Sequence, residues 1–199
     1  DLSDTSFIDS SVNTIFSGYL DHELSSKVIG MYHANKKIKH FDKLDTELLV
    51  VVESTPFYPE GGGQISDIGK IENESCSLLV TNVQKINNVI VHQVIIESGC
   101  VSIGDDIFLK INTKRRDKIA ANHSSTHLLN QALRDVLGDH VEQKGSLVTD
   151  KYLRFDFSHN KTLTVEEIRK IEAIVSFEID SDKDTHQKIS SYKDALKSG

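Results

Sequence analysis

The chain has 199 residues, of which 38% are hydrophobic and 27% charged, and it carries a formal net charge of −7. This length can bury the core of one large domain or two small ones, whereas the negative charge disfavours generic nucleic-acid binding, because phosphate contacts need local Lys and Arg. No apolar run approaches the ~20 residues of a membrane span and no basic-then-apolar leader is present, so we expect a cytoplasmic protein without membrane contact.

The first half of the chain is predicted to consist of short strands. Residues 1–15 are polar and rich in Ser and Asp, and we expect them to form an approach segment. Apolar runs separated by turn residues predict strands at 16–20, 27–32, 47–53, 68–72, 77–84, 89–96 and 107–112. The break at Asn87 and Asn88 predicts a tight hairpin. Because no long helical period precedes Thr113, residues 1–112 are expected to form a small antiparallel β-barrel.

Both prolines of the chain, Pro56 and Pro59, lie beside the three consecutive glycines at 61–63. Such a segment cannot continue a strand, and its glycines allow backbone conformations that other residues avoid. It is either a plain surface turn or a functional loop whose backbone approaches a ligand closely, and the motif alone leaves both open.

After Thr113 the periodicity becomes helical and continues until Gly138 offers a stop. Within this helix His123 and His127 are four residues apart, so both imidazoles lie on one face, where two histidines can reach one metal ion. Spacing alone favours the alternative of two solvated or core histidines.

The second half, 113–199, is expected to be α+β, with two helices against an antiparallel sheet. Strands are predicted at 146–148 and 152–158, the latter alternating with Leu153, Phe155 and Phe157 on one face. A capping box at 164–167 begins a second helix. The apolar stripe predicted for that helix consists of Ile168, Ile171, Val175 and Ile179. Residues 182–184 are expected to be exposed, and 189–199 to start another periodic element.

Two clusters of basic residues occur in this acidic chain: Lys36, Lys37 and Lys39, and Lys114, Arg115, Arg116 and Lys118. Each is either a solvated face or a phosphate contact, and the sequence does not decide between them. The second cluster directly precedes the histidine helix, so it would lie beside any site that the histidines form. Cys76 and Cys100 lack a CxxC or CxxxH pattern and are expected to be reduced thiols.

Three segments carry a resemblance to a known family. Residues 122–159, which begin NHSSTHLLNQ, closely resemble the editing domain of alanyl-tRNA synthetases and the related freestanding AlaX proteins. Residues 55–69, TPFYPEGGGQISDIG, resemble the glycine-rich motif of the barrel that precedes this domain, and 191–199, SYKDALKSG, resemble the start of a segment leading to the remaining metal ligands. The matches follow the order of the family and cover most of the chain.

The resemblance implies a barrel followed by an α/β-sandwich-like editing core, and it assigns roles to individual residues. His123 and His127 would be two ligands of a zinc ion. Thr126 would line the amino-acid pocket, with an ordinary helical threonine bonded to its own helix as the alternative. Gln143 would hold water or substrate, with a surface residue before a glycine turn as the alternative. The remaining substrate-binding residues would be Gly62, Gly63, Gln64, Arg115 and Arg116.

The implied activity is hydrolysis of the ester that joins a wrong amino acid, serine or glycine, to the 3′ end of alanine tRNA. A pocket built for alanine cannot strongly reject either, so a second hydrolytic site supplies the missing discrimination. The implied partners are the acceptor end of tRNA(Ala) and the remaining synthetase domains. His140 and His159 are expected to be solvated or core histidines without a ligand role.

One feature departs from the family, because its CxxxH motif, the source of two further metal ligands, is missing from this sequence. We therefore expect a truncated editing domain that contains half of its zinc site. Because two histidines hold zinc weakly, the fragment can lack the metal. The alternatives are a noncatalytic tRNA-binding or spacer module, a freestanding AlaX-type trans-editing deacylase, and a generic zinc hydrolase. The last lacks the usual HExxH motif.

Overall fold

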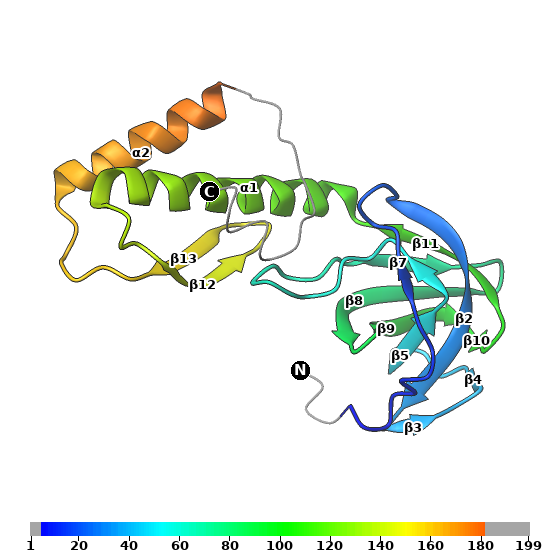
Figure 1. The fold of residues 1–199 in the computed structure, drawn as a ribbon. Coiled ribbons are helices and arrows are strands. Elements are labelled where there is room, and N and C mark those ends of the chain that lie inside the picture. Colours follow the sequence, from blue (N-terminus) through cyan, green and yellow to red (C-terminus); the bar gives the residue numbers. More distant parts are fainter. Residues whose placement is uncertain (1–4, 182–199) are drawn as a thin grey trace.

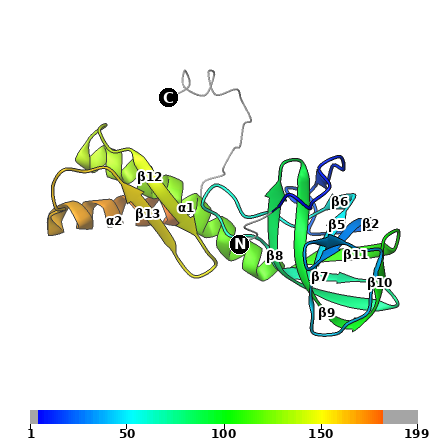
Figure 2. The same cartoon turned by 90° about the horizontal axis from the view of Figure 1, so that it is seen from below.

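The computed structural model describes residues 5–181 and consists of a β-barrel and a helical part, connected by one long helix (Figure 1). Viewed from below, this helix leaves the barrel and continues beside a two-stranded sheet, which lies in front of it (Figure 2). None of the helices in the described part of the chain is long and apolar enough to cross a membrane.

The barrel confirms the antiparallel architecture expected for the first half of the chain. Its sheet contains β2 (Glu23–His33), β3 (Lys36–Lys37), β5 (Glu47–Val52), β7 (Gly69–Glu72), β8 (Cys76–Ile86), β9 (Val89–Gly99) and β11 (Asp106–Ile111). The strand order is β11-β7-β8-β9-β5-β2-β3, and β11 also pairs with β2, so the sheet closes on itself. The predicted hairpin at Asn87 and Asn88 joins β8 to β9, with Asn87 at φ 55°.

The barrel interior is filled by alternate side chains of these strands. In β11 the pattern is regular: Ile107, Leu109 and Ile111 are buried, whereas Phe108 and Lys110 point outward. The fully buried side chains that share this core include Val28, Met31, Leu48, Val50, Phe57, Ile71, Leu78, Val80, Val94 and Ile96. This contiguous core stabilises the barrel, to which the helix that follows it is attached.

Short strands complete the barrel part, and one of them corrects a prediction. Strand β1 (Ile15–Phe16) pairs in parallel with β6 (Ser54–Thr55), and β4 (His40–Phe41) pairs with β10 (Val101–Ser102). The strand predicted at 16–20 was wrong beyond Phe16: residues 17–20 form a turn in which the Leu20 amide donates to the Ser17 carbonyl. Gly18 is needed there because a Cβ would collide with the Pro56 carbonyl oxygen.

The segment before β1 is more than a polar approach. Ile8 is 4% exposed and packs with Tyr32, Leu49 and Val91 in a second apolar cluster on the barrel. The backbone amide of Asp9 also donates to the hydroxyl of Tyr32. The few apolar residues within this Ser- and Asp-rich stretch therefore hold it against the sheet.

The long helix is α1 (Thr113–Leu137), and it begins and ends where the sequence predicts. The side chain of Asn112 accepts a hydrogen bond from the Arg115 amide as the N-cap, and Gly138 ends the helix with φ 110°. Strands β12 (Gln143–Val148) and β13 (Leu153–Phe157) then form the predicted antiparallel hairpin.

The second helix, α2 (Val165–Asp180), has the predicted capping box between Thr164 and Glu167. Its predicted stripe was partly wrong: Ile171 is buried, but Ile168 and Ile179 are 41% and 52% exposed. Val175 packs with Ile171 in the cluster shared with α1 and β13, as predicted, and Ile174, which the stripe did not include, joins them.

These elements confirm the mixed α+β class, with helices and antiparallel strands in the second half. Apolar side chains of α1, α2 and β13 share one cluster around Ala132, Leu133, Val141 and Ile171. The finer layering expected of an editing core stays a prediction, as does the division into domains at 112 and 113. The elements predicted at 182–184 and 189–199 lie outside the described residues.

Candidate active site

The two histidines of α1 lie side by side, as their spacing predicts. Their rings are stacked with centroids 5.2 Å apart and an interplanar angle of 21°. His123 is half-buried, whereas His127 is exposed. One histidine therefore faces the rest of the protein, and the other opens to solvent.

The glycine-rich loop of the barrel reaches this helix by joining the edge of β12. The Val148 amide donates to the Gly63 carbonyl at 2.7 Å, and the Ile65 amide donates to the Val148 carbonyl at 3.1 Å. Gln64 thus forms a parallel bridge with Val148. The segment for which the sequence left a plain surface turn and a functional loop open forms a strand-like connection between the barrel and the hairpin.

The glycines serve this connection in different ways. Gly63 has φ 82°, and a Cβ there would come within 2.5 Å of the Ser146 carbonyl oxygen, so only glycine fits against β12. Gly62 has φ 60° but open space around its missing Cβ. The close backbone approach that we expected toward a ligand is thus made toward β12 at Gly63.

Gln64 is the residue that this connection delivers to the histidines. Its side chain is 7% exposed, and its Oε1 lies 2.6 Å from Nδ1 of His123. Desolvation by burial, followed by the neighbouring His127, lowers the pKa of His123 below the ordinary 6.5. His123 is therefore neutral at pH 7, which is the form that binds a metal.

The residues present fit part of a zinc site. Two imidazoles on adjacent helical turns supply two nitrogen ligands, and the contact of His123 Nδ1 leaves its Nε2 open. Among residues 5–181 there is no group of three or more His, Cys, Asp or Glu that could hold a metal ion. Cys76 and Cys100 are free thiols of the barrel part.

The two residues expected to touch the amino acid are placed differently. Thr126 is 7% exposed, and its hydroxyl donates to the carbonyl of Asn122 at 2.9 Å, so the helical bond weighed above is present. The same hydroxyl oxygen can still accept a hydrogen bond. Gln143 is exposed at the start of β12, and its side-chain amide has no hydrogen bond within the described residues. Their roles toward substrate stay predictions.

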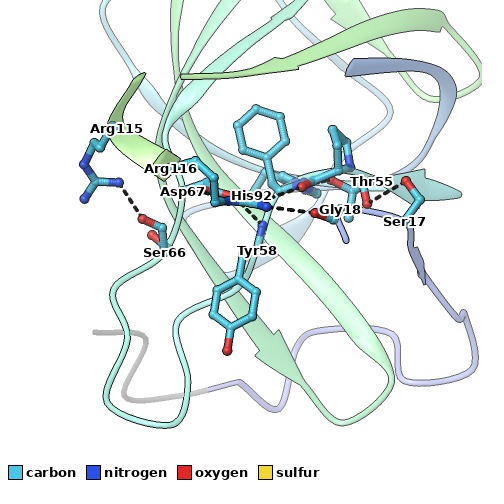
Figure 3. A network of polar contacts seen from close by, with 11 residues as sticks. Ser17, Gly18, Thr55, Tyr58, Ser66, Asp67, His92, Arg115 and Arg116 are labelled. Carbon is cyan, nitrogen blue, oxygen red and sulfur yellow. Dashed lines mark hydrogen bonds and ion pairs between the residues drawn. The ribbon is translucent and has the colours of Figure 1, made fainter. Parts of the chain in front are cut away.

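The two arginines of the second basic cluster hold α1 to the barrel (Figure 3). All three guanidinium nitrogens of Arg116 donate: Nε to Asp67 at 2.9 Å, Nη1 to the Gly18 carbonyl at 2.8 Å, and Nη2 to the Pro56 carbonyl at 3.0 Å. Arg115 Nη1 donates to the Ser66 carbonyl at 2.7 Å. The sequence left a solvated face and a phosphate contact open for this cluster, and the resemblance implied substrate binding by both arginines. In the structure all three guanidinium nitrogens of Arg116 already donate to the barrel.

The two lysines of the same cluster do not form ion pairs of this kind within the described residues. Lys114 and Lys118 are exposed, and neither forms an ion pair within residues 5–181. In the first cluster, Lys37 is paired with Asp9 at 2.9 Å. Positive charge that is free to meet a phosphate therefore remains on the lysines of α1. At 100° per residue these lysines lie on the face of the helix opposite to His123 and His127, so the position beside the histidine site expected for this cluster is wrong for them.

A second histidine pair was missed by sequence reasoning. We expected solvated or core histidines without a partner; His140 is exposed and His159 half-buried, and they have each other as partners, with His140 Nε2 2.9 Å from His159 Nδ1. The rings are stacked at 5.1 Å. The 19 residues that separate them in sequence leave no spacing signal, because the β12–β13 hairpin brings them together.

Comparison with known proteins places this geometry in context. Residues 2–115 match the family model of class II tRNA synthetases (A), which is more than half of the chain. The alanine–tRNA ligase of Cupriavidus necator is 43% identical over 188 residues, 94% of this chain and 21% of the relative. Those of Buchnera aphidicola and Leptospira biflexa are 41% and 44% identical over 96% and 83% of this chain. The chain thus spans about a fifth of the length of these relatives.

Proposed function

This chain belongs to the class II tRNA synthetase (A) family, and from that premise we propose that it forms an editing site. The proposed reaction is hydrolysis of the ester between serine or glycine and the 3′ end of alanine tRNA. The chain would act within an alanine–tRNA ligase, whose synthetic site cannot reject these two amino acids strongly enough by itself. Zinc and tRNA(Ala) are the cofactor and partner of this proposal.

The observation that carries the proposal is the convergence of two elements on one helix face. His123 and His127 stack on α1, and the glycine-rich loop brings the buried Gln64 within 2.6 Å of His123. A structural spacer has no need for two adjacent imidazoles, one of them exposed. In an ester hydrolase they hold the group that activates or anchors the reacting atoms.

Each residue has a role in that reaction. His123 and His127 would ligate zinc, with at least one more ligand from outside residues 5–181. Lewis-acid polarisation of a water or of the ester is the chemistry that zinc supplies there. The Thr126 hydroxyl would accept a hydrogen bond from the hydroxyl of a serine substrate, and the Gln143 amide would hold water or substrate.

The acceptor end of the tRNA would approach along the N-terminal half of α1. Lys114 and Lys118 are exposed on its first two turns, on the face of the helix opposite to the histidines, so they would contact phosphates away from the ester. Their charges are available for phosphates, in contrast to that of Arg116. With a net charge of −7 on the whole chain, this contact should be modest and sensitive to salt.

The experiment measures release of serine from mischarged seryl-tRNA(Ala). It compares this chain with a version continued by the downstream sequence of one of the relatives, and zinc is assayed in each. His123→Ala and His127→Ala should each slow release by at least ~100-fold, because losing one ligand disrupts the zinc site. His140→Ala, which changes an exposed histidine of the other pair, should have no effect.

Seryl-tRNA(Ala) that binds but is never hydrolysed, with zinc present or absent, would contradict the proposal. The chain would then be a noncatalytic tRNA-binding module. Equal loss of activity in His123→Ala and His140→Ala would show that the histidine pair of α1 has no special role.

A further inference from the structure

The hydrogen bond between Gln64 and His123 joins a loop of the barrel to a helix that is 59 residues further along the chain. Its Oε1 to Nδ1 distance of 2.6 Å is short for a hydrogen bond of this type. Gln64 is also almost completely buried, at 7% exposure. A buried amide aimed at one atom of one imidazole is a specific arrangement that a substrate contact at the surface would not require.

The backbone holds Gln64 from two sides, so its amide has little freedom to turn elsewhere. Within the loop, Gly61 and Gln64 exchange both backbone hydrogen bonds, at 3.1 and 3.0 Å. Toward the hairpin, the flanking residues Gly63 and Ile65 both bond to Val148. The position of the amide is therefore set by the fold before any substrate or metal arrives.

An amide oxygen can only accept a hydrogen bond, so Nδ1 of His123 must carry the proton. In a neutral imidazole this leaves the lone pair on Nε2 as the one available to a ligand. A nitrogen that is fixed in this way is also a better metal ligand, because the ring is already oriented and its basicity is raised.

We propose that Gln64 is a positioning residue, whose amide oxygen fixes the Nδ1–H tautomer of His123 and presents Nε2 to the metal. This inference rests on the proposed function for the identity of the ligand but not for the tautomer. It reassigns Gln64 from the substrate contact expected from the sequence to the support of a ligand. It also gives the pairing of the glycine-rich loop with β12 a purpose, since that pairing holds Gln64 in place.

The test compares the metal-free chain with Gln64→Met, which keeps the length of the side chain but removes the acceptor, and with Gln64→Glu, which keeps an oxygen. Two-bond ¹H–¹⁵N NMR correlations report which ring nitrogen of His123 carries the proton. We expect Nδ1–H in the wild type and in Gln64→Glu, and a shift toward Nε2–H in Gln64→Met. Thermal unfolding of each variant identifies any loss of fold.

Zinc affinity supplies a second readout, measured by competition with a chromophoric chelator on the chain continued by the downstream sequence of a relative. Gln64→Met should bind zinc about 10- to 100-fold more weakly than the wild type, with Gln64→Glu much closer to it. An Nε2–H tautomer in the wild type, or an unchanged tautomer in a folded Gln64→Met, would overturn the inference. Failure of the continued, zinc-loaded wild-type chain to hydrolyse seryl-tRNA(Ala) would instead overturn the proposed function and leave the tautomer result standing.

Discussion

Arg116 and Asp67 form an ion pair that connects the first turn of α1 to the barrel. Asp67 is 2% exposed, and the pair is bidentate through Nε and Nη2 of the arginine. Asp67 also accepts a hydrogen bond from the Tyr58 amide, so the carboxylate organises the loop that follows β6 (Figure 3). The direction in which α1 leaves the barrel, and with it the place of the histidines, depends on this pair.

Arg116→Met should lower the free energy of unfolding by about 3–5 kcal/mol, because it leaves the Asp67 carboxylate buried without its partner. The matched control is Arg134→Met on the same helix. It removes an exposed ion pair with Asp139 and should lower the free energy of unfolding by less than ~1 kcal/mol. Urea denaturation followed by circular dichroism measures both. Similar losses in the two variants would mean that the buried pair does not anchor α1.

Gly63→Ala should detach the glycine-rich loop from β12. The new Cβ would collide with Ser146, and φ 82° is strained for any residue with a side chain. Gly62→Ala is the control, since its φ of 60° causes similar backbone strain but its Cβ enters open space.

Hydrogen exchange at the Val148 amide reports the difference, because this amide donates to the Gly63 carbonyl. We expect exchange to accelerate by at least 10-fold in Gly63→Ala and to change little in Gly62→Ala. Equal protection in both variants would show that the loop does not need the close approach.

The barrel should become less stable as the pH falls below neutrality. Complete burial lowers the pKa of His92 from 6.5 to about 4, although the hydrogen bond to the Val50 carbonyl partly offsets this shift. The other ring nitrogen lies 2.8 Å from the Thr55 hydroxyl. The unfolded chain therefore binds the proton first. Stability is fully present above pH ~6.5 and decreases by about 1.4 kcal/mol per pH unit between there and pH ~4.

Urea midpoints at pH 7 and pH 5 measure this dependence. His92→Gln, which removes the titrating group, should flatten the slope, although the lowered pKa of His123 leaves a smaller one of the same sign. A slope that is identical with and without His92 would exclude it as the source.

The fold could largely be predicted from local patterns. Apolar runs between turn residues placed most strands, Asn87 and Asn88 marked the hairpin, and Thr113, Gly138 and Thr164 marked helix ends, because each of these signals acts within a few residues. The N-cap Asn112 was instead included in a predicted strand. The buried face of α2 was predicted incorrectly at Ile168, because a stripe of four apolar residues does not indicate which of its two edges packs against α1.

The site was only half predictable for the same reason. The spacing of His123 and His127 is a local signal, and the structure confirms that they are neighbours. The contact of Gln64 with His123 depends on how a barrel loop meets β12, which no periodicity records. Likewise, the sequence shows the charge of Arg116 but not that the buried Asp67 forms an ion pair with it.

Thr126→Val should reduce discrimination between substrates without unfolding the helix. The change removes a hydroxyl that donates within α1 and is proposed to accept from a serine substrate. Hydrolysis of seryl-tRNA(Ala) should decrease by about 10-fold relative to glycyl-tRNA(Ala), which has no hydroxyl to lose. The neighbouring Ser125 makes the same kind of bond, to the Ala121 carbonyl, so Ser125→Ala is the control and should leave the ratio unchanged.

The most direct test of the account is a comparison of two esters on the same tRNA. Single-turnover hydrolysis of seryl-tRNA(Ala) and alanyl-tRNA(Ala) is measured with the chain continued by the downstream sequence of a relative and loaded with zinc. The account predicts rapid release of serine and sparing of alanine, with both the release and the selectivity lost in the double variant His123→Ala, His127→Ala. Equal hydrolysis of the two esters, or no release of serine at all, would contradict an editing site built on this histidine pair.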